Sequence, residues 1–386
     1  MKEKNVFILG AGFSAPVGAP VIRDFLDRAR SLSMDSQQPM DETIRQSYEA
    51  VFNYRMAKDT LAAKAHIDLD DIENLFSVLE LESEYLRPEL LETKKHLIYM
   101  IVDTLNRTIQ PDAIAWGTLD QKTHTFISQR YGNIPGMPHV SLHAYFTLLA
   151  IGALAGVDYD TTFISFNYDL LLDNILQSFN VQPDYALAGR FQKGIEASGD
   201  LTAGTPPVRT IPLLKLHGSA NWAVCSQSSC DAPPIFYGSK SSDVLVDIRS
   251  NPCPTCHRQM VPLMVPPTWN KGALQARVKN IWKRAVDELR RARRIFFIGY
   301  SLRETDSYFR YLLALALEEN RDLEKIYVVD SDHLTEDESE ALRKRYEGLV
   351  TEHFRTRRLE LCYLQKGFDP FMRDHILPQA MHVKFP

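Results

Sequence analysis

A glycine-containing segment near the N-terminus has the residue types of an anion-binding turn. An apolar run ends in Gly10 and Gly12, and a helical pattern follows. Glycines let the backbone approach a phosphate closely, the N–H groups of a helix start can receive the anion, and Ser14 can add a hydroxyl donor. The spacing is not the dinucleotide fingerprint G-x-G-x-x-G. The segment therefore also fits a tight strand-to-helix turn that holds no ligand.

Polar side chains also follow two other apolar runs. Asn167 and Asp169 come after the run at 161–166, and His217 ends the run at 212–218. An amide and a carboxylate together suit ribose hydroxyls, and a histidine is a candidate general base near neutral pH. Each has a structural alternative: Asn167 or Asp169 could cap the next helix, and a single histidine is more often structural or exposed.

Cysteines supply a candidate metal site. They form two close pairs, Cys225 with Cys230 and Cys253 with Cys256. This spacing predicts a tetrahedral, structural Zn²⁺ site closed by four thiolates. His257 is an alternative ligand should one cysteine not bind, and Cys362 is expected to be a small buried apolar residue.

Short, continuously apolar runs predict the strands that position these groups. Such runs are typical of a parallel sheet covered on both faces, and amphipathic stretches follow most of them. They lie at residues 5–10, 161–166, 212–218, 294–300, 325–330 and 358–364. We therefore expect an α/β fold with a doubly wound parallel sheet, whose ligands bind beyond the carboxyl ends of the strands.

Two segments interrupt this alternation within a single domain spanning 1–386. Residues 35–157 carry helical patterns without a convincing strand, which predicts a large helical insertion. Within it, Glu73 is expected to be an exposed helix carboxylate. Residues 222–262 are rich in turns and poor in helical periodicity, and they contain the four paired cysteines, which predicts a small zinc-binding lobe.

Composition limits the partners and the location. The net charge is -5, so no global field draws the chain to nucleic acid or anionic lipid, and the basic run at 282–294 is interpreted as a solvated helix face. Direct nucleic-acid binding is not expected. The N-terminal apolar segment is too short for a signal peptide, which predicts a cytoplasmic protein. The run at 147–157 is too short to span a membrane and predicts a buried helix.

Taken in order, these motifs resemble the sirtuin family. Positions of the first motif match the signature G-A-G-x-S-x-x-S-G-I-P-D-F-R at Gly10, Ala11, Gly12, Ser14, Gly18, Ala19, Pro20 and Arg23. The segment at 165–169 resembles T-Q-N-I-D, the family's catalytic histidine falls on His217, and the cysteine pairs match its zinc ribbon. Gly299 to Leu302, which includes Ser301, resembles the G-T-S-L turn, and Asp330 stands where the family places a residue near the adenosine.

The resemblance implies a Rossmann-like sirtuin core that binds NAD. The diphosphate would lie on the opening turn, the ribose near Asn167 and His217, and the nicotinamide in a pocket closed by Arg23. Nicotinamide would leave through an oxocarbenium-like state. The nucleophile that follows would be an acetyl-lysine carbonyl in a deacylase, or water in a sirtuin-like NADase, positioned by Asn167 and assisted by His217.

Departures from the family pattern favour water. Ile22 replaces the phenylalanine that shields the nicotinamide site in deacylases, and Phe166 and Tyr168 replace the Q and I of T-Q-N-I-D. Pro266 and Pro267 remove N–H groups that a peptide strand would pair with. Together with the insertion, these features resemble the bacterial sirtuin-like proteins of anti-phage defence, most of all the subunit paired with a HerA-type ATPase.

The sequence therefore predicts an NAD⁺ hydrolase that releases nicotinamide and ADP-ribose, depletes NAD as a defence effector, and assembles as a homo-oligomer with a HerA-type ATPase. Two alternatives stay open. One is an NAD-dependent protein deacylase, and the other is a non-catalytic NAD or ADP-ribose sensor.

Overall fold

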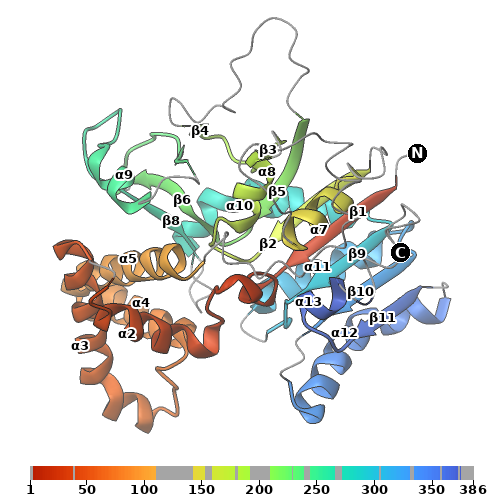
Figure 1. The fold of residues 1–386 in the computed structure, drawn as a ribbon, viewed down its shortest axis with the longest axis horizontal. Coiled ribbons are helices and arrows are strands. Elements are labelled where there is room, and N and C mark those ends of the chain that lie inside the picture. Colours follow the sequence, from red (N-terminus) through yellow and green to blue (C-terminus); the bar gives the residue numbers. More distant parts are fainter. Residues whose placement is uncertain are drawn as a thin grey trace, which may run out of the picture.

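The main sheet has seven parallel strands, in the order β11-β10-β9-β1-β2-β5-β3 (Figure 1). They are β1 (Lys4–Leu9), β2 (Asp160–Ser165), β3 (Val181–Asp184), β5 (Arg209–Lys215), β9 (Arg294–Ile298), β10 (Lys325–Val329) and β11 (Glu360–Leu364). The structure is a computed structural model that describes residues 3–37, 40–109, 142–152, 159–178, 181–191, 209–227, 229–238, 244–265, 272–303, 306–330, 334–356, 359–372 and 374. The predicted parallel sheet is confirmed, and β3 is the strand that the sequence did not predict.

Aromatic side chains pack helices onto both faces of this sheet. On one face, the Phe7 ring lies 4.6 Å from that of Phe296 and 5.4 Å from that of Phe146 in α7 (Leu142–Ala150). On the other face, the ring of Phe297 lies 4.9 Å from that of Tyr346 in α12 (Glu336–Thr356). Successive strand residues point to opposite faces, so neighbouring phenylalanines serve both layers. All of α7 is buried, as expected for the start of the apolar run at 147–157; residues 153–158 lie outside the described residues.

The other helices packed with the sheet follow its strands. They are α1 (Ala11–Ser14), α8 (Leu171–Ser178), α10 (Gly272–Leu289), α11 (Ser307–Glu319) and α13 (Phe368–Phe371). The basic run at 282–294 begins on α10, as expected. Arg290 and Arg291 are exposed there, whereas Glu288 is fully buried and pairs with Lys4 and Arg284.

A second unit consists of a helical group and a small sheet. The helices are α2 (Phe25–Met34), α3 (Glu42–Lys64), α4 (Ile72–Tyr85) and α5 (Leu91–Thr108), drawn in red to orange in Figure 1. The small sheet has the order β4-β7-β6-β8, with β4 (Arg190–Phe191), β6 (Gly218–Cys225), β7 (Ile235–Phe236) and β8 (Met260–Met264). A short helix, α9 (Val244–Ser250), lies in the cysteine-bearing lobe, where helical periodicity was not expected.

The helical group and the cysteine lobe share one hydrophobic core. Tyr48, Leu75 and Met100 of the helices belong to the same buried cluster as Ile248 and Met260 of the lobe. The parallel sheet has a separate core. The helical group and the cysteine lobe thus pack against each other, and the helices line a pocket together with residues that follow strands of the parallel sheet. No helix among the described segments is both long and apolar enough to cross a membrane.

The order of the strands reverses at β1. The chain runs from β1 to β2 on one side, whereas β9 pairs with the other side of β1 and leads to β10 and β11. Ligands of open α/β sheets bind in the crevice at such a switch point, outside the carboxyl ends of the strands. Gly10 and Gly299 each stand directly after one of the two strands that flank this crevice.

A buried histidine makes the stability of this layer pH-dependent. Nε2 of His143 lies 2.7 Å from the carbonyl oxygen of Phe13, and burial lowers the pKa of His143 to about 4. The unfolded chain takes up this proton near pH 6.5 and the folded chain only near pH 4. The neutral state of His143 therefore contributes about 3 kcal/mol to the free energy of unfolding. This contribution is fully present above pH 6.5 and is lost as the pH falls towards 4.

His143→Gln keeps a donor for the Phe13 carbonyl but cannot titrate. Urea unfolding at pH 7.5 and pH 4.5 should show that the variant loses about 2.5 kcal/mol less stability on acidification than the wild type. An equal loss in the two proteins would contradict the buried, neutral state of His143.

Candidate functional site

The turns after β1 and β9 rest directly on each other. The N–H of Gly10 donates to the carbonyl of Ile298, and that of Gly12 donates to the carbonyl of Gly299, both at 3.0 Å. A Cβ on Gly12 would lie 2.7 Å from Cα of Gly299, which itself has a φ of +61°. The glycines are required for this close approach. Because the N–H groups of Gly10 and Gly12 are used inside the protein, an anion here would need other donors of the turn.

Asn167 is fixed against the first turn by its amide nitrogen. Nδ2 donates to the carbonyl of Gly10 at 2.9 Å and to Oγ of Ser14 at 3.2 Å. Nothing else described bonds to the side chain, so Oδ1 is the atom offered to a ligand. Ser14 itself is fully buried behind this contact.

The Asp169 carboxylate has the helix-capping role that the sequence offered as the alternative to ligand binding. Its Oδ1 accepts a hydrogen bond from the N–H of Leu171 at 3.0 Å and so caps the start of α8. Burial raises the pKa of Asp169, while Lys215 and the hydrogen bonds to the carboxylate oppose that rise. Asp169 still lines the pocket described below.

His217 follows β5 and is almost fully buried. Its ring lies edge-on to that of Phe166, with centroids 5.1 Å apart, and its Nε2 lies 3.9 Å from Oδ1 of Asp306. Behind it, Nζ of the buried Lys215 donates to the carbonyl of Asp169 at 2.6 Å and pairs with Asp173 at 3.0 Å. This lysine joins the turn after β2 to the strand that carries His217.

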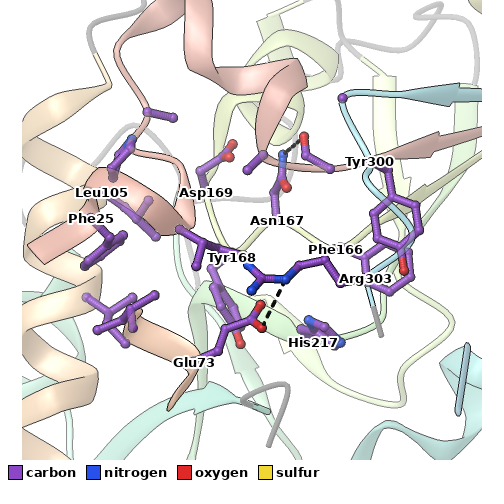
Figure 2. Close-up of a pocket in the computed structure, with 18 of the residues that line it drawn as sticks. Phe25, Glu73, Leu105, Phe166, Asn167, Tyr168, Asp169, His217, Tyr300 and Arg303 are labelled. Atoms are coloured by element: carbon purple, nitrogen blue, oxygen red, sulfur yellow. Dashed lines mark hydrogen bonds and ion pairs between the residues drawn. The ribbon is translucent and has the colours of Figure 1, made fainter. Parts of the chain in front are cut away.

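One cavity of about 990 Å³, counting the space at its mouth, brings these groups together. Figure 2 shows Asn167 and His217 at its wall, with Arg303 near them and Glu73 of the helical group facing Arg303. Among the predicted site residues, its lining includes Gly10, Ala11, Pro20, Asn167, Asp169, His217, Gly299 and Ser301. The opposite wall is apolar and comes from Phe25, Phe76, Ile101 and Leu105 of the helical group.

Part of the chain that forms this site is similar to known proteins. Residues 161–351, which contain Asn167, His217 and the cysteine pairs, match the model of the SIR2-like domain. A solved structure of Sir2 bound to an inhibitor, 2'-O-acetyl-ADP-ribose and a deacetylated p53 peptide is 13% identical; the match covers 99% of this chain and 94% of that one, with a TM-score of 0.37. No curated protein matches the chain.

Other predicted residues lie beside the main pocket. Gly12, Arg23 and Asp330 line an adjoining cavity, which shares Ala11 and Gly299 with the main pocket. The Arg23 side chain is 76% exposed and lies 3.5 Å from Glu338. The structure therefore does not bring Arg23 to Asn167, and its closing role stays a prediction.

Glu73 was expected to be exposed, and that expectation is wrong. Its side chain is 11% exposed, and its Oε2 lies 3.7 Å from Nε of Arg303. Nη2 of the same arginine donates to Oδ2 of Asp71 at 2.8 Å. Asp306 and Tyr300 also line the pocket without having been predicted. The one available signal was that Arg303 and Asp306 directly follow the matched turn at 299–302.

The four paired cysteines converge, with all sulfur atoms within 4.8 Å of one another. Sγ of Cys225 lies 3.3 Å from that of Cys256, and Cys230 lies 3.7 Å from Cys253. A ZnS₄ tetrahedron with bonds near 2.3 Å has edges of about 3.8 Å, so the donor set fits Zn²⁺. Burial opposes ionisation of Cys253, but the N–H groups of Cys256 and Thr255 outweigh it and lower its pKa to about 7.

His257 is outside this group of ligands. It has a φ of +57° and donates its N–H to the carbonyl of Cys253 at 2.9 Å, which closes the tight turn around the second pair. Cys362 is only partly buried in β11 and donates to Glu360 at 3.3 Å. The expectation of full burial for Cys362 is therefore wrong.

Cys253→Ser should abolish stoichiometric zinc and lower the melting temperature, because a structural site with three thiolates holds the metal poorly. Metal analysis of purified protein and differential scanning calorimetry measure both effects. Cys362→Ser is the matched control and should keep its zinc. Full zinc content in Cys253→Ser would rule out the four-cysteine site.

Proposed function

We propose that the pocket hydrolyses NAD⁺ to nicotinamide and ADP-ribose. The observation that carries the proposal is the placement of Asn167 Oδ1 and the His217 imidazole in one cavity at the switch point of a SIR2-like domain. A hydrogen-bond acceptor and a titratable base at one cavity suit a reaction in which water must be oriented and deprotonated. NAD binding itself fits a domain of this kind.

In the proposed reaction, the bond between the ribose C1' and the nicotinamide nitrogen breaks, and nicotinamide leaves as a neutral base with the bonding electrons. A water molecule forms the new C1'–O bond. Oδ1 of Asn167 accepts a hydrogen bond from that water or from a ribose hydroxyl, because Nδ2 is already bound to Gly10 and Ser14. His217 takes the proton that the water loses.

Backbone contacts near the cysteine lobe favour water over an acyl-lysine peptide as the nucleophile. A peptide that adds a strand needs free N–H and C=O groups at the edge of its host. At Val265, directly after β8, the N–H donates to the carbonyl of His217 at 2.7 Å and the C=O accepts from the Tyr168 hydroxyl at 2.9 Å. Pro262 within β8 has no N–H to offer. Pro266 and Pro267 lie outside the described residues.

Asn167→Ala and His217→Ala should each lower nicotinamide release by about 10²-fold or more while leaving the melting temperature within a few degrees, because each removes a group that acts on the water. Chromatography of NAD⁺ incubated with purified protein measures the products.

A parallel reaction that also contains an acetylated peptide distinguishes the two alternatives. Release that depends on the peptide would indicate the deacylase, and binding without turnover would indicate the sensor.

We further propose that this hydrolase acts in the cytoplasm as an effector of anti-phage defence, as a homo-oligomer assembled with a HerA-type ATPase. The support is the sequence resemblance described above. Within the same proposal, residues 35–157 form the helical insertion and 222–262 the zinc-binding lobe of a single domain spanning 1–386. Co-expression with a HerA-type ATPase encoded beside this gene should yield one co-purifying complex; two separately eluting proteins would contradict the pairing.

A further inference from the structure

Asp306 occupies a helix-capping position but does not cap its helix. It stands at the N-cap of α11, where an aspartate side chain ordinarily accepts a backbone N–H, yet no such bond forms. Instead its side chain, 7% exposed, turns into the pocket. One carboxylate oxygen accepts the Tyr300 hydroxyl at 2.8 Å. The other, Oδ1, accepts no hydrogen bond from the described residues and lies 3.9 Å from Nε2 of His217.

The surroundings fix this carboxylate in place. The Tyr300 ring stacks on that of Phe166, with centroids 4.2 Å apart. The backbone carbonyl of Tyr300 accepts a hydrogen bond from the Tyr346 hydroxyl. The N-terminus of α11 favours a negative charge at Asp306. A buried carboxylate oxygen without a partner is costly, so the inward orientation needs a compensating interaction. Catalytic hydrogen bonds are often long in ligand-free sites, and the imidazole is the group within reach.

We propose that Asp306 is the positioning residue of His217. Its Oδ1 accepts a hydrogen bond from Nε2–H of His217, and its charge stabilises the imidazolium formed when His217 takes the proton of the attacking water. Tyr300 in turn orients Asp306. This inference rests on the proposed hydrolase reaction for its catalytic part, whereas the pairing itself is a property of the ligand-free protein.

The other titratable groups around His217 have different partners. The Tyr168 ring lies 6.2 Å from the imidazole, and its hydroxyl donates to Val265. Burial, followed by the charges of Glu73 and Asp306, raises its pKa well above the usual value, so it stays neutral. Glu73 on α4 pairs with Arg303. Among the residues that the structure describes, Asp306 is thus the group that presents a carboxylate oxygen to the imidazole nitrogen.

The first test needs no turnover. The measurement is NMR of the protein labelled with ¹⁵N-histidine, in which the His217 signal is identified by its loss in His217→Gln. In the wild type, His217 should be the tautomer that carries its proton on Nε2. Asp306→Asn should lower the titration midpoint of His217 by about one pH unit, because an adjacent anion favours the protonated imidazole. Tyr300→Phe should give a smaller shift in the same direction. Asp337→Asn, on the exposed face of α12, is the matched control and should leave the midpoint unchanged.

The second test uses nicotinamide release. Asp306→Asn should lower kcat by about tenfold or more with a smaller change in KM, and it should move the acidic limb of the kcat/KM profile to lower pH, since the neutral imidazole is the base. Asp337→Asn should match the wild type.

The two proposals fail in different ways. A wild-type protein that releases no nicotinamide would defeat the hydrolase but leave the NMR comparison decisive for the pairing. An unchanged His217 midpoint and tautomer in a folded Asp306→Asn protein, its melting temperature near that of the wild type, would overturn the role of Asp306 whatever the activity.

Discussion

Direct backbone contact between the turns after β1 and β9 is the constraint on which the site depends. Gly12 and Gly299 meet at a distance that no side chain would permit, and the N–H groups of Gly10 and Gly12 donate to the carbonyls of Ile298 and Gly299. This contact sets the carbonyl of Gly10, to which Nδ2 of Asn167 is bound. It also sets the start of the segment that carries Tyr300 and Asp306. This pair of turns therefore fixes the backbone against which Asn167 is held and from which the segment with Tyr300 and Asp306 begins.

The remaining wall comes from a separate hydrophobic core. The helical group and the cysteine lobe pack into one cluster, and the helices present Phe25, Phe76 and Leu105 to the pocket. Between the two cores, Arg303 links the turn after β9 to Asp71 and Glu73 at the start of α4. The site is thus shared between two packing units that only the folded chain brings together.

How far the sequence could predict this arrangement depends on how local each signal is. Continuous apolar runs predicted six strands of the parallel sheet, and cysteine spacing predicted the cluster of thiols, because both patterns lie within short segments. The strand at Val181–Asp184 has no such run and was missed. Asn167 and His217 could be placed at strand ends, and parallel strands bring their carboxyl ends to one edge.

The parts that sequence patterns did not predict depend on contacts between distant segments. The Glu73 side chain is only 11% exposed, and its carboxylate lies 3.7 Å from Arg303, more than two hundred residues later. Asp306 has the residue type and position of an ordinary helix cap, and only the three-dimensional structure shows its carboxylate turned towards His217. Arg23 likewise lies beside Glu338 of α12, a residue more than three hundred positions later, and its side chain is exposed.

The shared core of the helical group and the cysteine lobe has a consequence for redox chemistry. Cys225 and Cys253 are buried in the same cluster as the helices that wall the pocket. Oxidation of these thiols would change the packing beneath that wall without touching Asn167 or His217. The wall of the pocket therefore rests on packing around sulfur atoms that do not themselves line it.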